Sequence, residues 1–227
     1  MELKYIGKVH TDFPTKFGLP RQAGLAPGLM GRVELEKEFQ KSEAFRGLEG
    51  YSHIWILWEF SEFKDKEWSV TVRPPRLGGN VRVGVFASRS PNRPNSIAMS
   101  VVKLERIDFD CPNGPIIYVS GIDMMDGTPV LDIKPYVASD IKADAVCGFS
   151  DRVKDINLEV EMEGYAWLKL PENQRENVAQ ILAQNPIPHY QSDPNRVYGF
   201  EYAGYEIKFR VEGGRAVLVD VQQANLD

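Results

Sequence analysis

Two arginines, Arg89 and Arg93, lie in a run from Gly84 to Asn95 that also holds two prolines and two asparagines. Pro91 and Pro94 fix the backbone dihedral φ and remove N–H donors, so we expect a stiff turn at which strand pairing stops. A guanidinium held in such a turn binds a carboxylate or a phosphate through two parallel hydrogen bonds. The run therefore predicts an anion-binding site. A rigid hairpin corner whose arginines pair with nearby acids explains it equally well.

The charge around this run is unevenly spread. Five arginines and no acid occur between residues 73 and 93, namely Arg73, Arg76, Arg82, Arg89 and Arg93. The whole chain has a net charge of −5, which argues against a protein that coats nucleic acid without selectivity. A local basic face favours a phosphate partner, although a solvated surface is the commoner explanation of such a cluster.

A second segment, Asp126 to Tyr136, combines acids, apolar residues and an aromatic ring. Asp132 stands among apolar neighbours, so we expect a partly buried carboxylate that needs a partner. Tyr136 follows Pro135 and offers a rigid aromatic face on which a base can stack. The segment is therefore a second candidate for binding or catalysis.

Histidines and cysteines are too few and too scattered for a metal centre. The chain holds three histidines and two cysteines, without HExxH or paired-cysteine spacing, so we expect no bound metal and no disulfide framework. The longest apolar stretch, Ile54 to Phe60, is far too short to span a membrane. The first five residues do not resemble a signal peptide. A cytoplasmic protein is predicted.

Short strand-like runs dominate the first part of the chain. Their β-branched and aromatic residues are bounded by turn signals, which is typical of a β-barrel or sandwich. The expected strands are Leu3–Val9, Tyr51–Phe60, Trp68–Arg73, Val81–Phe86, Ile97–Ile107 and Ile116–Ile122. A parallel doubly wound sheet would need a helix between successive strands. The one early helical signal, Ser42–Leu48, is only a turn or two long.

The composition of the sequence changes after residue 137. Residues 138–150 mix small and charged side chains and are predicted to be a connector. Beyond it, a strand or two over Leu158–Leu170, a helix over Pro171–Gln184 and a terminal hairpin over Tyr205–Val221 are expected. The predicted fold is mainly β, with a small β-barrel domain over residues 1–137 and a smaller α+β domain over residues 151–227.

The run Gly84 to Asn95, GVFASRSPNRPN, resembles the signature of the TsaA-like, TrmO family, G-V-F-A-[ST]-R-S-P-x-R-P-N-P-I-G. Ser96 and Ala98 depart from that pattern, and both keep a small side chain at their position. Asp126 to Tyr136, DGTPVLDIKPY, matches a second family motif without departure. Two shorter segments, Pro20-Arg21-Gln22 and Ser52-His53-Ile54-Trp55, resemble further family segments, and the C-terminal part resembles the family's appended domain more loosely, through Asp193-Pro194-Asn195-Arg196 and Tyr198-Gly199-Phe200.

The resemblance implies a compact β-barrel enzyme that binds S-adenosylmethionine without a Rossmann fold and acts as a homodimer. Family members methylate N6 of the threonylcarbamoyl-modified adenosine beside the anticodon of a tRNA. On this chain the family's cofactor contacts fall at Pro20, Arg21, Gln22, His53, Ile54, Arg89, Met99, Thr128, Pro129, Val130, Leu131 and Asp132. Arg93, Asn95, Lys134 and Tyr136 are the candidates for binding the substrate.

Methyl transfer from a sulfonium is an in-line displacement, so the main tasks of the protein are positioning and exclusion of water. The N6–H of the substrate must lose its proton, which calls for a general base. Our hypothesis is that Asp132 or Asp126 takes this proton. Because a small barrel leaves a cofactor partly exposed, we expect a dimer whose partner subunit closes the site.

Two other classes of function remain open on the sequence. One is a non-catalytic sensor that binds S-adenosylmethionine or a nucleoside, and the other is a β-barrel that grips RNA phosphates without a cofactor. The C-terminal domain has a comparable ambiguity. Its basic and aromatic residues, Arg196, Tyr198, Lys208, Arg210 and Arg215, form a candidate surface for the tRNA anticodon arm, or the domain is a structural appendage.

Overall fold

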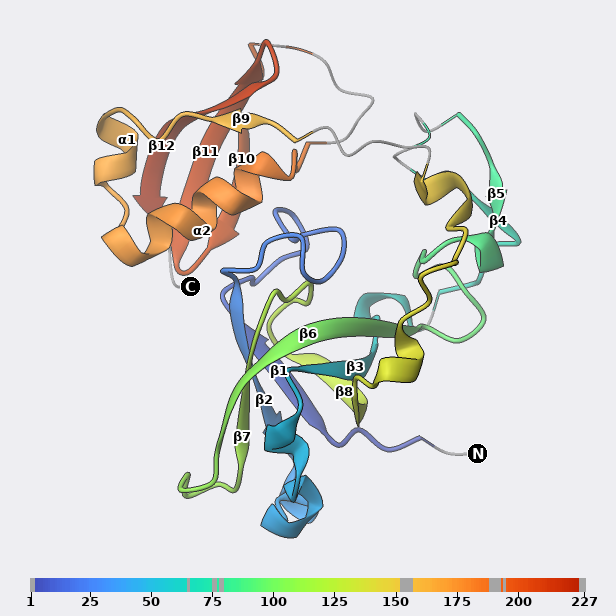
Figure 1. Ribbon diagram of the computed structural model, residues 1–227. Coiled ribbons are helices and arrows are strands. Elements are labelled where there is room, and N and C mark those ends of the chain that lie inside the picture. Colours follow the sequence, from blue (N-terminus) through green and yellow to red (C-terminus); the bar gives the residue numbers. More distant parts are fainter. Residues whose placement is uncertain are drawn as a thin grey trace.

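The computed structural model describes residues 3–64, 66–74, 77, 80–151, 157–187, 193 and 195–224 (Figure 1). Within these ranges the chain forms a closed β-barrel, a small two-stranded sheet, and a four-stranded sheet accompanied by helices. Of the residues singled out in the sequence, Arg76 and Pro194 lie outside the described residues.

Six strands close into the barrel in the order β1-β2-β7-β6-β3-β8, with every neighbouring pair antiparallel. They are β1 (Gly7–Thr11), β2 (Met30–Leu35), β3 (His53–Glu59), β6 (Ile97–Asp108), β7 (Ile116–Ser120) and β8 (Thr128–Pro135). Pairing of β8 with both β3 and β1 completes the ring, which removes the open edges that a flat sheet would present. The predicted mainly-β barrel is confirmed.

Side chains of the barrel alternate between its interior and its outer surface, as the pleat of a strand requires. In β3, Ile54, Ile56 and Trp58 are buried, whereas the residues between them are partly exposed. In β6, Ser100 and Val102 likewise point inward. The outer surface of this part of the barrel is therefore built from the intervening positions of β3 and β6.

The local pattern of β-branched and aromatic residues between turn signals predicted the positions of β3, β6 and β7 well, but it did not predict β2 or β8. β8 contains Pro129 and Pro135, which cannot donate to a ladder and obscure its strand character. The prediction of a strand over Leu3–Val9 is wrong in position, because β1 begins at Gly7. From Gly7 to Val9 the chain is paired with β2 and β8 at once, and a Cβ on Gly7 would lie 2.3 Å from the Glu34 carbonyl oxygen.

Other early elements are shorter than predicted. Strands were expected over Trp68–Arg73 and Val81–Phe86. Only β4 (Thr71–Val72) and β5 (Val83–Gly84) form there, and they pair with each other outside the barrel. The helix predicted over Ser42–Leu48 is interrupted by Gly47 at φ 89°. Short 3₁₀ turns occur at Lys37–Phe39, Ser42–Phe45, Leu48–Gly50, Ser61–Phe63, Val85–Ala87, Ala138–Asp140 and Gly148–Asp151.

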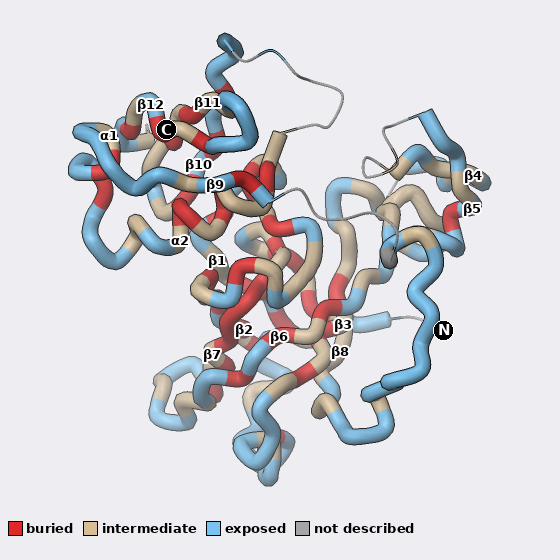
Figure 2. The backbone as a smooth tube through the Cα atoms, turned by 45° about the horizontal axis from the view of Figure 1, so that its top comes forward, coloured by how far each residue is buried: buried red, intermediate tan, exposed pale blue. Residues whose placement is uncertain are grey.

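The C-terminal region has an α+β structure, as predicted. Its elements are β9 (Glu159–Val160), α1 (Tyr165–Leu168), α2 (Glu172–Ala183), β10 (Tyr198–Tyr202), β11 (Tyr205–Glu212) and β12 (Arg215–Gln223). The sheet order is β10-β11-β12-β9, in which β9 runs parallel to β12. Figure 2 shows buried residues both in this region and on the barrel strands. None of the helices in the described ranges is long and apolar enough to cross a membrane.

The predicted helix and terminal hairpin of this region are confirmed. α2 follows Pro171 and buries Val178, Ile181 and Leu182, and β11 pairs with β12 across the two-glycine turn. The prediction of strands over Leu158–Leu170 is wrong beyond Val160. There the chain turns at Gly164, which has a φ of 109°, and enters α1, which buries Trp167.

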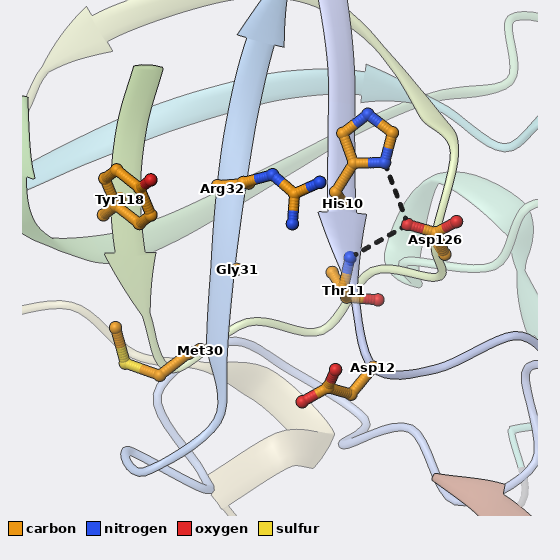
Figure 3. A pocket seen from close by; sticks show the side chains of 8 residues that line it. All are labelled: His10, Thr11, Asp12, Met30, Gly31, Arg32, Tyr118 and Asp126. Carbon is orange, nitrogen blue, oxygen red and sulfur yellow. Dashed lines mark hydrogen bonds and ion pairs between the residues drawn. The ribbon is translucent and has the colours of Figure 1, made fainter. Parts of the chain in front are cut away.

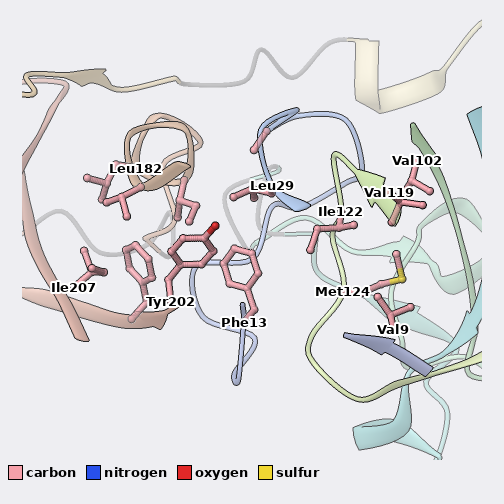
Figure 4. Packing of buried hydrophobic residues seen from close by; sticks show 14 of the residues in the cluster. Val9, Phe13, Leu29, Val102, Val119, Ile122, Met124, Leu182, Tyr202 and Ile207 are labelled. Atoms are coloured by element: carbon pink, nitrogen blue, oxygen red, sulfur yellow. The ribbon is translucent and has the colours of Figure 1, made fainter. Parts of the chain in front are cut away.

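The barrel and the C-terminal region share one apolar core, which Figure 4 shows as a row of side chains running from Val9 to Ile207. At the junction the rings of Phe13 and Tyr202 lie 4.8 Å apart and both are buried. A Cβ on Gly18, whose φ is 93°, would come within 2.7 Å of the Phe200 ring. Close packing of this kind fixes the position of the C-terminal region relative to the barrel.

Hydrogen bonds also tie the loop between β1 and β2 to the C-terminal region. Gly28 N–H donates to Gln180 Oε1 at 2.9 Å, and Gln184 Nε2 donates to the Leu25 carbonyl at 3.1 Å. The Arg21 guanidinium donates to the carbonyl of Asn185 at 2.9 Å. Residues 18–29 are therefore held between the barrel and α2, although their glycines and prolines alone suggest a plain surface loop.

Replacing Phe13 by alanine should destabilise both units together. Loss of a fully buried ring lowers the free energy of unfolding by about 3–5 kcal/mol, measurable by urea denaturation. Tyr165→Ala on α1 is a matched control, because Tyr165 is 76% exposed and its removal should cost less than about 1 kcal/mol. An unchanged urea midpoint for Phe13→Ala would show that the two units do not depend on a shared core.

Candidate cofactor-binding site

Two of the sequence motifs meet at one point. Arg89 donates a hydrogen bond from its guanidinium to Gln22 Oε1 at 3.0 Å, which joins the proline-rich run to the loop between β1 and β2. Within this loop Pro20 is buried, and Arg89 is exposed at the surface. The structure therefore brings Gln22 and Arg89 together.

The run itself is a stiff turn, as its prolines predict. Ser90 N–H donates to Ser88 Oγ at 3.2 Å, Arg93 N–H to the Pro91 carbonyl at 2.8 Å, and the Arg93 guanidinium to the Ser88 carbonyl at 3.3 Å. Among the described residues, neither Arg89 nor Arg93 forms an ion pair with an acid. Both guanidinium groups thus retain charge for an anionic partner. Asn95 is exposed on the same turn.

A third group of predicted residues lies on the outer surface of β3, β6 and β8. The register places Met99 opposite Leu57, and Leu57 opposite Asp132. Met99 is 48% exposed. His53 lies at the start of the same surface, where its carbonyl accepts a hydrogen bond from Tyr136 N–H at 3.1 Å. This surface therefore collects side chains from three separate motifs.

A β-bulge decides which way Asp132 points. Val130 pairs with Trp58 and Asp132 pairs with Leu57, so Leu131 is the extra residue between them. Without the bulge, Val130 and Asp132 would share one face of the strand, because side chains alternate with a period of two. With it, Val130 lies fully buried in the barrel and the Asp132 side chain is 45% exposed.

Asp132 has a charged partner in Lys134, whose ammonium lies 2.7 Å from Asp132 Oδ2. Asp132 Oδ1 also accepts a hydrogen bond from Ile133 N–H at 2.9 Å. Beside this pair, the Tyr136 ring packs against Trp55 with centroids 5.8 Å apart. Trp55 Nε1 donates to Asp140 at 2.9 Å, a hydrogen bond that lowers the pKa of the Asp140 carboxyl.

Not every predicted residue offers its side chain to this surface. Ile54 and Val130 are fully buried in the barrel core, and Thr128 is nearly so. Thr128 Oγ1 donates to the Met125 carbonyl at 2.7 Å and so stabilises the turn before β8. Pro129 and Leu131 are partly exposed. Ile54, Thr128 and Val130 therefore position the site from within the barrel.

Asp126 lies in different surroundings from Asp132. Its Oδ1 accepts hydrogen bonds from Thr11 N–H and from His10 Nδ1, both at 3.1 Å (Figure 3). It borders an open recess of about 340 Å³ on the outer surface of β1, β2 and β7. The recess is lined by His10, Thr11, Asp12, Met30, Gly31, Arg32, Tyr118 and Asp126. The two candidate bases thus contact different sets of residues.

Sequence reasoning missed Asp123, an acid that the structure places beside the meeting point of the motifs. Ser100 Oγ donates to Asp123 Oδ1 at 2.7 Å, and the backbone N–H of Ala23 donates to the same carboxylate. Burial raises the pKa of the Asp123 carboxyl, and the positive charge of Arg89 opposes that rise. An acid between apolar Ile122 and Met124 is the same signal that singled out Asp132.

Gln22, Arg89 and Asp123 form a set of polar side chains that suits a ligand carrying both a carboxylate and a cation. The guanidinium complements the carboxylate, and the Asp123 carboxylate complements the cation. Within the described residues, three or more histidine, cysteine or acidic side chains do not gather into a group that would hold a metal ion. The residues present therefore fit a cationic organic cofactor.

Comparison with protein families finds two matches along the chain. The model of the tRNA-methyltransferase O N-terminal domain matches residues 8–141. The model of the TrmO C-terminal domain matches residues 155–224. Together they cover both the barrel and the C-terminal region.

Individual relatives agree with these matches. The chain is 44% identical over 203 residues to a "Putative S-adenosylmethionine-dependent methyltransferase RcsF" of Pseudomonas aeruginosa, covering 86% of this chain and 85% of that protein. It is 35% identical over 219 residues to a "tRNA (adenine(37)-N6)-methyltransferase" of Escherichia coli, covering 92% and 93%. A crystal structure of TrmO from Pseudomonas aeruginosa superposes with a TM-score of 0.79 at 34% identity, covering 98% of each chain.

The Ser100 hydroxyl should hold down the pKa of Asp123, because its hydrogen bond favours the ionised carboxylate. In Ser100→Ala that pKa should rise further above its ordinary value, as measured by carbon-13 NMR titration of the carboxyl group. Ser42→Ala, which removes an exposed hydroxyl outside this cluster, is the control. An unchanged Asp123 titration in Ser100→Ala would contradict the hydrogen bond.

Proposed function

The chain belongs to the tRNA-methyltransferase O family, and on this premise we propose that it is an S-adenosylmethionine-dependent tRNA (adenine37-N6)-methyltransferase. The single observation that supports this most directly is the hydrogen bond between Arg89 and Gln22, because it unites two distant motifs beside the acid Asp123. Neither a sensor nor a cofactor-free RNA-binding barrel is favoured by the family to which the chain belongs.

For the cofactor we propose the residues that surround this contact. Gln22 and Arg89 lie at its centre, with Pro20 and Arg21 before Gln22 in the loop. We add His53, Met99 and Asp132, which share the outer surface of β3, β6 and β8, and Ile54 and Thr128 to Leu131, which lie on β3 and β8. S-adenosylmethionine supplies an electrophilic methyl group on a sulfonium. The protein contributes binding, orientation and exclusion of water.

For the substrate we propose Arg93, Asn95, Lys134 and Tyr136. The held guanidinium of Arg93 suits a phosphate or the carboxylate of a threonylcarbamoyl group, and Tyr136 offers a ring for stacking. Asp132 or Asp126 accepts the proton that leaves N6 of the adenosine. Asp132 shares its surface with Met99, whereas Asp126 lies beside the recess near His10.

We also propose a cytoplasmic homodimer that engages the anticodon arm. Apolar side chains on the outer surface of β6, Ile97 and Met99, are 37% and 48% exposed, which leaves room for a partner subunit to cover them.

In the C-terminal region, Lys208, Arg210 and Arg215 pair with acids. This pairing favours a structural role for that region, which holds residues 18–29 in place.

Methylation of tRNA should depend on Arg93 and on Asp132. Loss of a general base slows the reaction by about 10²- to 10⁴-fold, so Asp132→Asn should show this loss if Asp132 is the base. Arg93→Ala should raise KM for tRNA. The measurement is mass spectrometry of tRNA nucleosides after incubation with S-adenosylmethionine.

Arg46→Ala serves as the control in this assay, because Arg46 is an exposed arginine outside the proposed site. Wild-type methylation rates in both Asp132→Asn and Arg93→Ala would contradict Asp132 as the general base and Arg93 as a substrate-binding residue. Wild-type protein that leaves tRNA unmethylated would contradict the proposed function itself.

The proposed dimer should be visible by analytical ultracentrifugation. A charge placed on the outer surface of β6 by Ile97→Glu should shift the protein towards the monomer and lower its methylation rate, because the site would stay open. Val146→Glu, at an apolar residue of the connector that is 90% exposed, should leave both unchanged. A fully active monomer would contradict the shared site.

A further inference from the structure

Asp123 differs from the other acids near the proposed site in how its charge is compensated. Asp132 is paired with Lys134, and Asp126 is bonded to His10. Asp123 receives only neutral donors, the Ser100 hydroxyl and backbone N–H groups, and it forms no ion pair among the described residues. A carboxylate largely removed from water is unfavourable unless a cation balances it.

The position of Asp123 is set from several sides. Trp58 Nε1–H donates to Ser100 Oγ at 3.0 Å, so the serine hydroxyl proton is directed to Asp123 Oδ1 at 2.7 Å. Ala23, whose N–H donates to the same carboxylate, directly follows Gln22, and the positive charge of Arg89 acts on that carboxylate. Asp123 therefore lies beside the contact between Gln22 and Arg89, and it is partly exposed there.

We propose that Asp123 is a further cofactor-binding residue, whose carboxylate pairs with a cationic group of S-adenosylmethionine. The inference rests on the proposed function and names a contact beyond the family motifs. The cofactor carries an ammonium, a sulfonium and a carboxylate. Arg89, with no acid paired to it among the described residues, complements the carboxylate, and Asp123 complements a cation, so the two side chains give the site a polarity that matches the ligand.

The raised pKa of Asp123 agrees with this assignment. Burial is its main cause, and Arg89 is the charged side chain whose field acts against it. A cation brought close to the carboxylate lowers its pKa, because it stabilises the ionised form. The ligand-free protein thus holds an acid whose ionised form lacks a close positive partner.

Isothermal titration calorimetry on the full chain tests the contact. Asp123→Asn keeps the shape and one of the two acceptor oxygens but removes the charge, and it should weaken S-adenosylmethionine binding by about 10- to 100-fold, as expected for loss of a charge-assisted hydrogen bond. S-adenosylhomocysteine keeps the ammonium and lacks the sulfonium charge. An equal loss for both ligands assigns Asp123 to the ammonium, and a larger loss for S-adenosylmethionine assigns it to the sulfonium.

Asp144→Asn, at an exposed acid of the connector, is the matched control and should bind both ligands as wild type does. The ligand-free Asp123→Asn protein should melt at the wild-type temperature or above it, because a desolvated charge has been removed. A merely structural role of Asp123 would lower that temperature instead. Equal affinity of wild type and Asp123→Asn for S-adenosylmethionine would overturn the inference and leave the proposed function standing.

A second measurement needs no variant. In wild-type protein, saturation with S-adenosylmethionine should lower the pKa of Asp123 in a carbon-13 NMR titration, and an unchanged pKa would overturn the inference even if Asp123→Asn did not fold. Failure of the wild-type protein to bind S-adenosylmethionine at all would instead refute the proposed function. The two failures are therefore distinguishable.

Discussion

Closure of the barrel by β8 is the constraint on which the rest of the structure depends. β8 pairs with β1 on one side and with β3 on the other, so the segment that carries the second family motif is also the one that completes the ring. A closed ring fixes the register of every strand, because a slip of one residue would turn apolar side chains outward. The bulge at Leu131 is tolerated within this ring, and it is what exposes Asp132.

The C-terminal region stabilises a different part of the site. Its helix α2 and strand β10 hold the glycine- and proline-rich residues 18–29 through hydrogen bonds to Gly28 and Leu25 and through the close approach of Gly18 to the Phe200 ring. A loop that is held in this way presents Gln22 to Arg89 in a fixed position. The C-terminal region thus contributes to the cofactor site without supplying a predicted cofactor residue.

Charged side chains in and around the site differ in whether an oppositely charged side chain of the protein pairs with them. Lys134 neutralises Asp132, and acids neutralise Lys208, Arg210 and Arg215 on the C-terminal sheet. In the part of the chain that the structure describes, Arg89 and Asp123 lack such ion pairs. Because an unpaired carboxylate that is largely removed from water is costly, Asp123 is the physical basis for the proposed contact with a cationic group of the ligand.

Local sequence by itself determined the elements with strong periodicity and the stiffness of the arginine run. The alternation in β3 and β6, the apolar face of α2, the terminal hairpin and the two prolines at 91 and 94 were each readable within a short window. The motifs also indicated the family, since they occur in order along the chain. Only the tertiary structure decided that β2 and β8 are barrel strands, that Asp132 points outward, and that Trp58, Ser100, Asp123 and Ala23 form one network. These features arise from pairing between strands far apart in the chain, and local periodicity does not specify which strands pair or in which register.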